Sequence, residues 1–293
     1  MAVHIINKPL GWTSHDVVAR ARKLLGTRKV GHTGTLDPLA TGVLILVSEE
    51  STKLVPFLEK TSKDYIGYVS LGASTPTLDA EGPVVQRADC RLQIAEKTRL
   101  EAILAGFVGK QMQVPPQYSA IHVDGRRAYD MVRAGEEVKL EPRAIEVLFL
   151  ELQEVLPHMP VDAMFPPALG EFVTLKIAVG VSSGTYIRSL ARDIGAALEM
   201  PAHLAGLIRT RVGNFKLEDA IEVESLRPDT GIPDLAALEF PILELSAKEA
   251  RDVRDGKKIS SQFTGRATLM SAGQLVAIAD GDGSSLKVVR AWQ

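Results

Sequence analysis

The stretch GHTGTLDPLATGVL, residues 31–44, combines three glycines, three threonines and a single carboxylate, Asp37. Glycine adopts backbone conformations that cost other residues energy. Pro38 fixes its own φ and favours extended backbone at Asp37. These residues predict a rigid, tightly turned loop that displays Asp37, as a reactive carboxylate requires. Taken alone, an Asp-Pro pair in a loop is more often an ordinary turn, so the rest of the chain has to decide between the two interpretations.

Four further motifs flank this stretch. They are NKPLGWTS at residues 7–14, KDY at 63–65, SGTYIR at 183–188 and LIRT at 207–210. Together with residues 31–44, and in the same order, they resemble the motifs of the TruB family of tRNA pseudouridine synthases, whose signature is GHTG-x-LDP-x-A-x-G-x-L. Such a string is far more specific than a lone GxGxxG. The resemblance covers roughly residues 5 to 215 and favours the reactive carboxylate.

The conversion of uridine into pseudouridine breaks a C–N glycosidic bond, rotates the base and forms a C–C bond. It requires a nucleophile, a group that handles the C5 proton, and a dry pocket around a flipped-out base. The resemblance implies that Asp37 is the nucleophile, and attack on the ribose C1′ and on the base C6 both remain open. Tyr65 offers an aromatic face for stacking and a hydroxyl for proton transfer. A guanidinium holds a carboxylate bidentately and keeps it ionised, so Arg188 is the expected partner of Asp37.

Three residues near these motifs are expected to contact the substrate. Tyr186 would line the same pocket, with packing as the less favoured alternative. Leu207 would press on the base, although taken alone it would be assigned to the core. His32 is expected to contact RNA rather than to act as a general base, because a histidine ring can stack on bases.

The basic residues are clustered, although the net charge of the chain is only -2. Residues of about 112–140 resemble the RNA-gripping insertion of the family, in which Arg126 and Arg127 would meet phosphates. Lys8 is a further predicted RNA contact. It begins a run of cations within the first thirty residues, and such a run, taken alone, is more often a solvated helix face than an RNA contact.

The composition is that of a soluble globular chain. Its 293 residues are 45% hydrophobic and 24% charged, which is enough for a large core. Cys90 is the only cysteine, so an intramolecular disulfide is excluded and its thiol is expected to be inert. The six histidines are scattered, and we predict no metal and no cofactor. No apolar run approaches the ~18 residues of a membrane helix. The N-terminus also lacks a signal-peptide pattern, which predicts a cytoplasmic protein.

Helix and strand patterns interleave without a regular βαβ repeat. The sequence predicts helices at residues 15–25, 100–107 and 187–198, and strands at 43–47, 65–71 and 172–179. This order favours an α+β protein with a mixed, mainly antiparallel sheet flanked by helices over a doubly wound one. The resemblance implies a pseudouridine synthase-like fold, with which this arrangement agrees.

Two domains are expected. Residues 1–240 would form the catalytic domain, within which the proline-rich residues 157–170 would be a surface insertion with no catalytic part. Residues 241–293 predict a capped helix followed by short strands. They resemble the small PUA-like RNA-binding domain that many family members carry, and a generic small β module is the alternative.

The resemblance implies an isomerase that forms pseudouridine in the T-loop of tRNA, conventionally at position 55, by base flipping. Its partner would be the T-arm stem-loop of tRNA, with no membrane and no protein partner, and the enzyme would be a monomer. Two alternatives remain: a tRNA-binding folding chaperone, and a pseudouridine synthase that acts on another RNA. The intact set of Asp37, Tyr65 and Arg188 argues against lost catalysis, and the short C-terminal region favours a stand-alone enzyme.

Overall fold

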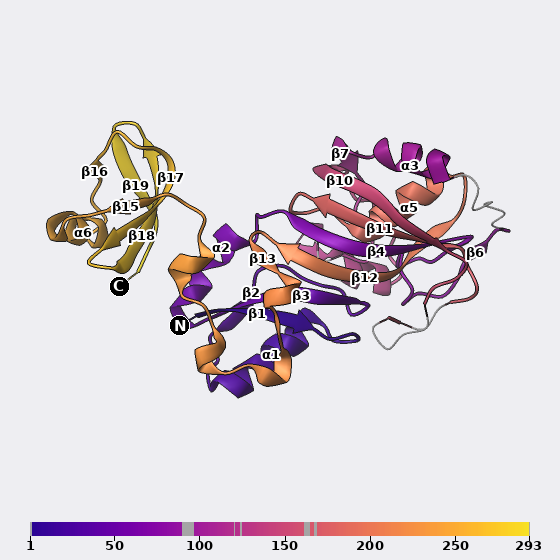
Figure 1. Ribbon diagram of the computed structural model, residues 1–293, viewed down its shortest axis with the longest axis horizontal. Helices are drawn as coiled ribbons and strands as arrows, with labels where there is room; N and C mark the ends of the chain where they lie inside the picture. The colour runs from indigo at the N-terminus through magenta and orange to yellow at the C-terminus, as the bar shows by residue number, and fades with distance from the viewer. Residues whose placement is uncertain are drawn as a thin grey trace.

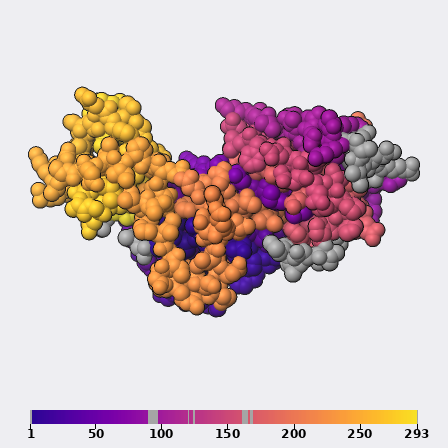
Figure 2. Space-filling model, in the orientation of Figure 1, coloured from indigo at the N-terminus to yellow at the C-terminus, as the bar shows by residue number. Residues whose placement is uncertain are grey.

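The computed structural model describes residues 2–89, 97–119, 121–123, 125–160, 165–166 and 169–292. Cys90, expected to carry an inert thiol, lies outside these ranges. A large sheet with helices on its faces forms the body of the molecule, and a smaller β module stands at one end, as Figure 1 and Figure 2 show. Within the described ranges, no helix combines the length and the apolar character that crossing a membrane would require.

The large sheet contains ten described strands. Along its main path they are β14 (Ile221–Glu222), β1 (Ala2–Lys8), β3 (Ala40–Ser48), β12 (Ala202–Val212), β4 (Lys63–Leu71), β11 (Thr174–Val181), β10 (Arg143–Leu156) and β7 (Gly109–Gln113). Off this path, β2 (Val30–His32) pairs with β3, and β13 (Phe215–Lys216) pairs with β12. In the part of the chain that the structure describes, β1–β14 and β3–β12 are the parallel pairs of this sheet. The predicted mixed, mainly antiparallel sheet is therefore confirmed.

Helices cover different parts of this sheet (Figure 1). α3 (Lys97–Ala105) packs on β10, and α5 (Ile187–Ala197) packs on β12 and β4. α1 (Ser14–Leu25) packs its buried side chains against β1 and β3. The shorter elements are η1 (Glu49–Leu54), α2 (Val55–Leu58), β5 (Ala73–Ser74), β6 (Gln86–Arg87), β8 (His122–Val123), β9 (Arg126–Arg127), α4 (Ala128–Arg133), η3 (Leu217–Asp219), η4 (Val223–Ser225), η5 (Pro228–Thr230) and η6 (Asp234–Ala237).

Local signals account for the elements that the sequence predicts. The helix at 15–25 is α1, which starts with a capping box: Thr13 Oγ1 accepts the Asp16 N–H at 3.1 Å, and an Asp16 oxygen accepts the Thr13 N–H at 2.8 Å. The other predicted elements correspond, with shifted ends, to β3, β4, β11, α3 and α5. Strands β1, β10 and β12 were not predicted from the sequence. β12 contains Gly206 and two arginines, so it lacks the alternating β-branched pattern that indicates a strand.

Strand β4 is buried on both of its faces. Tyr65 and Val69 point into the core under α5, whereas Tyr68 lies in a cluster with Met159 and Phe165. The Tyr68 and Phe165 ring centroids are 4.6 Å apart. The expectation that residues 157–170 form a surface insertion is therefore corrected in part, because two of their described side chains cover the second face of the sheet.

The C-terminal module is a five-stranded sheet with one helix. Its elements are β15 (Ile242–Glu244), α6 (Ala247–Arg254), β16 (Ile259–Ser260), β17 (Thr264–Ser271), β18 (Gln274–Asp282) and β19 (Ser285–Ala291). Ile278 and Trp292 of the module share a hydrophobic core with Phe57 of α2. The Arg266 guanidinium lies 5.4 Å from the Phe57 ring, and Lys53 Nζ donates to the Ala291 carbonyl at 3.2 Å. The prediction of a small β-rich C-terminal domain is confirmed, and its likeness to a PUA domain stays a prediction.

Candidate active site

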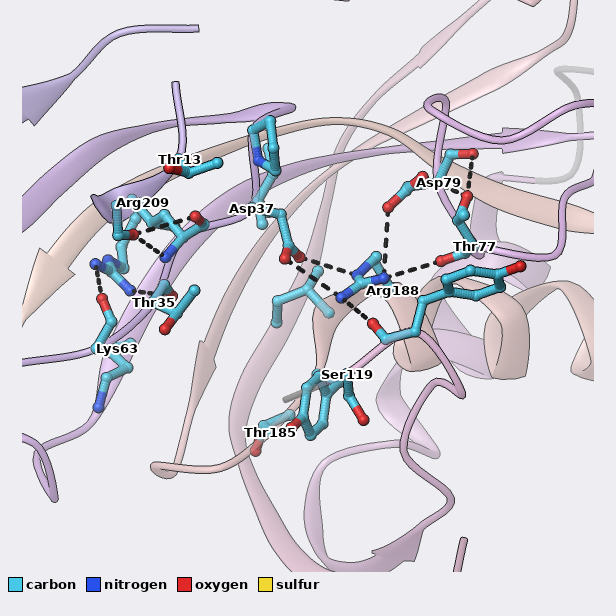
Figure 3. A pocket seen from close by; sticks show the side chains of 18 of the residues that line it. Thr13, Thr35, Asp37, Lys63, Thr77, Asp79, Ser119, Thr185, Arg188 and Arg209 are labelled. Atoms are coloured by element: carbon cyan, nitrogen blue, oxygen red, sulfur yellow. Dashed lines mark hydrogen bonds and ion pairs between the residues drawn. The ribbon is translucent and has the colours of Figure 1, made fainter. Parts of the chain in front are cut away.

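A cavity of ≈ 830 Å³ opens beside the loop that carries Asp37 (Figure 3). Its walls come from that loop, from β4, from the loop after β5, from the 114–142 segment and from the start of α5. Five of the nine predicted site residues line it: Asp37, Tyr65, Tyr186, Arg188 and Leu207. The fold thus brings together residues that are up to 170 positions apart in the chain, counting from Asp37 to Leu207.

The shape of the Asp37 loop depends on a close approach between β3 and β12. Gly42 pairs with Arg209 across these parallel strands and has a φ of +100°. A Cβ at Gly42 would lie 2.2 Å from the Arg209 carbonyl oxygen, so no larger residue fits there. On the other side, Ser14 Oγ accepts the Leu36 N–H at 2.8 Å, which fastens the loop to α1. The glycine-rich sequence therefore serves strand packing as well as the turn.

Asp37 and Arg188 form the pair that the sequence predicts. Arg188 Nε lies 2.9 Å from Asp37 Oδ2, and Arg188 Nη2 donates to Asp37 Oδ1 at 3.3 Å. The Arg188 side chain is 8% exposed, whereas that of Asp37 is 36% exposed. The carboxylate therefore faces the cavity while the guanidinium supports it from the protein side. Because the arginine is shielded from water, its hold on the carboxylate is little screened.

Asp79 is a second carboxylate on Arg188, and the sequence analysis missed it. Its Oδ2 lies 3.5 Å from Arg188 Nη1, and its side chain is 3% exposed. Oδ1 accepts hydrogen bonds from Thr77 Oγ1 at 2.5 Å and from the Glu81 N–H at 3.0 Å. Burial raises the pKa of Asp79, while these donors and Arg188 oppose that rise. Nothing in the loop sequence distinguishes Asp79 from an ordinary turn aspartate.

Arg209 lies on the opposite side of Asp37 (Figure 3) and was also missed, although it belongs to the LIRT motif. It is 2% exposed, and it has no ion pair among the described residues. Its donors go to backbone carbonyls instead: Nε to Val43 at 2.6 Å, Nη1 to Thr35 at 3.3 Å and Nη2 to Gly34 at 3.2 Å. Burial lowers the pKa of Arg209, and the neighbouring Tyr65 and Asp37 oppose this. Arg209 therefore fixes the backbone of the Asp37 loop and of the strand that follows it.

Two lysines are buried in the same way. Lys8 Nζ donates to the Pro9 and Trp12 carbonyls at 3.0 and 2.6 Å, and burial lowers the pKa of Lys8 to about 8. Lys63 Nζ donates to the Glu59 and Thr61 carbonyls, and burial lowers its pKa to about 8 as well. Lys8 is 0% exposed, so a phosphate cannot reach it in this conformation. The expectation that Lys8 contacts RNA is thereby corrected: it fixes the turn that precedes α1.

His32 sits on β2, half-buried beside the cavity. Its Nδ1 accepts the Gly34 N–H at 3.3 Å, and its ring centroid is 5.4 Å from that of His15 in an edge-to-face arrangement. Burial lowers the pKa of His32 to about 4, so its imidazole is neutral near pH 7. It is His15 that lines the cavity. An RNA contact by His32 stays a prediction.

Arg126 and Arg127 lie in the short hairpin of β8 and β9, and both are exposed. Arg126 Nη1 is 2.9 Å from a Glu136 carboxylate oxygen, so its positive charge is partly neutralised by an ion pair within the protein. Tyr129 and Arg133, from the following helix α4, line the cavity. The predicted insertion therefore does reach the site, but its grip on RNA is untested.

Comparison with known proteins assigns the class. The TruB family pseudouridylate synthase N-terminal domain matches residues 22–187, and the tRNA pseudouridylate synthase B C-terminal domain matches residues 188–230. The chain is 50% identical over 309 residues to tRNA pseudouridine synthase B of Deinococcus radiodurans, with 100% of both chains covered. It is 46% identical over 312 residues to tRNA pseudouridine synthase B of Thermus thermophilus, with 100% of this chain and 99% of the relative covered.

Solved structures share the fold. A Cbf5-Nop10-Gar1 complex contains a chain with a TM-score of 0.71 and 26% identity, and an H/ACA RNP bound to a substrate RNA containing 2'-deoxyuridine contains one with a TM-score of 0.68 and 24% identity. Each match covers 100% of this chain and 85% of the other. Fold, motifs and relatives together define a pseudouridine-forming isomerase. The chain belongs to the TruB family of pseudouridylate synthases, and the resemblance noted in its motifs is confirmed.

Proposed function

We propose that this protein converts a uridine in the T-loop of tRNA, conventionally position 55, into pseudouridine with Asp37 as the nucleophile. The observation that carries the proposal is the Asp37 carboxylate held by Arg188 at the wall of a cavity of ≈ 830 Å³. A cavity of this size lies in the range of roughly 300–1,000 Å³ that small ligands occupy, so it can hold a flipped-out nucleotide. Two relatives named tRNA pseudouridine synthase B favour tRNA as the substrate.

The reaction balances as an isomerisation. The bond between C1′ and N1 breaks, a bond between C1′ and C5 forms, C5 loses a proton and N1 gains one. Asp37 would form a covalent bond to C1′ or to C6, and either route leaves the same product. Arg188 would keep Asp37 ionised and aimed at the substrate, since a guanidinium stabilises a carboxylate that accepts its hydrogen bonds.

The other cavity residues would hold the base. Tyr65 would stack on uracil and take part in proton transfer at C5, and Leu207 would press on the base from the same wall. Tyr186 would line the entrance. His32, Arg126 and Arg127 are proposed RNA contacts outside the cavity. We further propose that the enzyme acts as a cytoplasmic monomer on the T-arm stem-loop.

Tritium release tests this proposal. A tRNA that carries 5-tritiated uridine loses tritium to water when the C5 proton is exchanged for the new C–C bond. We expect release from the wild-type T-arm and none from a T-arm in which the target uridine is replaced by cytidine. Release that persists after this replacement would show that the enzyme modifies another uridine and would overturn the proposed T-loop substrate.

A further inference from the structure

Residues 114–142 form an excursion from the sheet that touches both the cavity and the helix carrying Arg188. The excursion begins after Gln113, at the end of β7, and returns at Arg143, the first residue of β10, and these two residues are register partners. It has a small hydrophobic core of its own, to which the Tyr186 side chain contributes. Its cavity-lining residues are Tyr118, Ser119, Tyr129 and Arg133.

Gln113 joins the root of this excursion to the first turn of α5. Its Oε1 accepts the Tyr186 N–H at 2.9 Å, and its Nε2 donates to the Tyr186 carbonyl at 3.1 Å. Gln113 is 3% exposed, so these bonds are made away from water. Tyr186 is the N-cap of α5 and has no capping hydrogen bond from its own side chain. Gln113 therefore satisfies a backbone N–H that the helix leaves without a partner.

Two further contacts tie the same segment to the same helix. Ser189 Oγ donates to the Val114 carbonyl at 2.9 Å, and Arg192 Nη2 donates to that carbonyl at 3.1 Å. The root of the excursion is therefore held along the first turns of α5.

The catalytic pair itself receives a contact from the excursion. Arg188 Nη2, the nitrogen that donates to Asp37 Oδ1, also donates to the Tyr118 carbonyl at 3.1 Å. A displacement of residues 113–118 would remove one acceptor of Arg188 and shift the helix start that aims it. The guanidinium orientation therefore depends on the position of the excursion.

We propose that Gln113 is a positioning residue that couples the seating of the 114–142 excursion to the alignment of Arg188 with Asp37. RNA that holds the excursion in the position seen here would thereby complete the catalytic pair, which links substrate capture to chemistry. This inference rests on the proposed function, because it takes Asp37 and Arg188 as the groups that react with and orient the substrate.

The test compares two glutamines of the same strand. Gln113→Leu removes both hydrogen bonds at similar volume and leaves the Tyr186 N–H unpaired, whereas Gln111→Leu removes a bond to the Phe107 carbonyl. Single-turnover tritium release is measured at saturating T-arm RNA, together with the RNA dissociation constant and the melting temperature. We expect the rate to fall about 10- to 100-fold in Gln113→Leu and less than about threefold in Gln111→Leu. RNA affinity should change less than about threefold.

Two further variants separate positioning from general destabilisation. In an Arg188→Lys background, Gln113→Leu should lower the single-turnover rate less than about threefold, because the guanidinium that Gln113 positions is already absent. Gln113→Glu keeps the acceptor for Tyr186 but lacks the donor when ionised. Because position 113 is buried, the pKa of the introduced carboxyl should lie well above the ordinary glutamate value of about 4.3. Its rate relative to wild type should therefore recover as the pH falls from about 8 to about 5.5 and the carboxyl becomes protonated.

Three outcomes would overturn the inference: equal losses in Gln113→Leu and Gln111→Leu, additive losses in the double variant, or a pH-independent defect in Gln113→Glu. Failure of the proposed function looks different. If the wild-type enzyme releases tritium from another RNA but not from the T-arm, the T-loop proposal fails, and the same Gln113 comparison is then made on that RNA.

Discussion

Each side of the cavity buries an arginine, and the two guanidinium groups have different partners within the protein. Arg188 faces the carboxylates of Asp37 and Asp79, at 2.9 and 3.5 Å, and also donates to the Thr77 and Tyr118 carbonyls. Arg209 faces three backbone carbonyls. An arginine between carboxylates sets the charge and direction of a reactive group, whereas an arginine among carbonyls fixes the course of the backbone. We therefore expect the same residue type to serve chemistry on one side and architecture on the other, a difference that the following variants test.

The largest effect is expected at the carboxylate that joins the two sides. Asp37→Asn keeps the size of the side chain but removes its nucleophilic charge, and most RNA affinity should come from phosphate contacts elsewhere. We expect tritium release to fall by more than the ~10²–10⁴-fold typical of one acid–base group, with RNA binding largely unchanged. A rate within about tenfold of wild type would remove Asp37 from the role of nucleophile.

Arg188→Lys tests the carboxylate side. Lysine keeps the positive charge but cannot contact Asp37 with two nitrogens while also reaching Asp79. We expect the single-turnover rate to fall about 10²-fold, as for the loss of one preorganised donor. The melting temperature should fall as well, because the buried Asp79 carboxylate and the Thr77 and Tyr118 carbonyls lose donors. An unchanged rate and pH profile would contradict the Asp37–Arg188 partnership.

Arg209→Lys tests the carbonyl side and should lower stability with a much smaller loss of rate than Arg188→Lys. Lysine cannot reach the Val43, Thr35 and Gly34 carbonyls together, so at least one buried carbonyl loses its donor. We expect the free energy of unfolding to fall by about 2 kcal/mol, measured by urea denaturation. If Arg209→Lys slowed the reaction and left the free energy of unfolding unchanged, Arg209 would belong with the chemistry rather than with the backbone.

The smallest effect is expected at Lys8, which shares the carbonyl side. Its pKa is lowered to about 8, so between pH ~8 and ~10.5 the unfolded chain binds more protons than the folded one. Stability contributed by this group therefore rises with pH across that window. Lys8→Met should reduce this rise by about 1.6 kcal/mol between pH 8 and 9.5, and should leave stability near pH 7 within about 1 kcal/mol of wild type.

Urea denaturation at several pH values measures the Lys8 effect, with Lys29→Met as the control, because Lys29 is an exposed lysine with weakly held surface ion pairs. An identical pH dependence in wild type and Lys8→Met would show that Lys8 is hydrated and free to meet RNA.

Interactions between neighbours in sequence are what made parts of this protein predictable. The capping box that starts α1 spans four residues, and the strand at 65–71 shows its alternation within its own length. The Asp37–Arg188 pair is a different case. Its side chains are 151 residues apart, and the sequence suggested their contact because the family motifs placed complementary charges at both positions.

The roles of Asp79, Arg209, Lys8 and Gln113 were decided by the tertiary structure. Each carries a polar group whose partner depends on strand pairing or helix packing: Arg209 reaches Val43 across 166 residues, and Gln113 reaches Tyr186 across 73. The sequence determined that a carboxylate stands on a glycine-rich loop, that an arginine is its expected partner, and that an α+β fold displays it. Only the packed sheet determined which cations face carboxylates and which face carbonyls. A buried charge takes whatever acceptor the folded backbone brings within hydrogen-bonding distance, and that distance is not encoded in any local pattern.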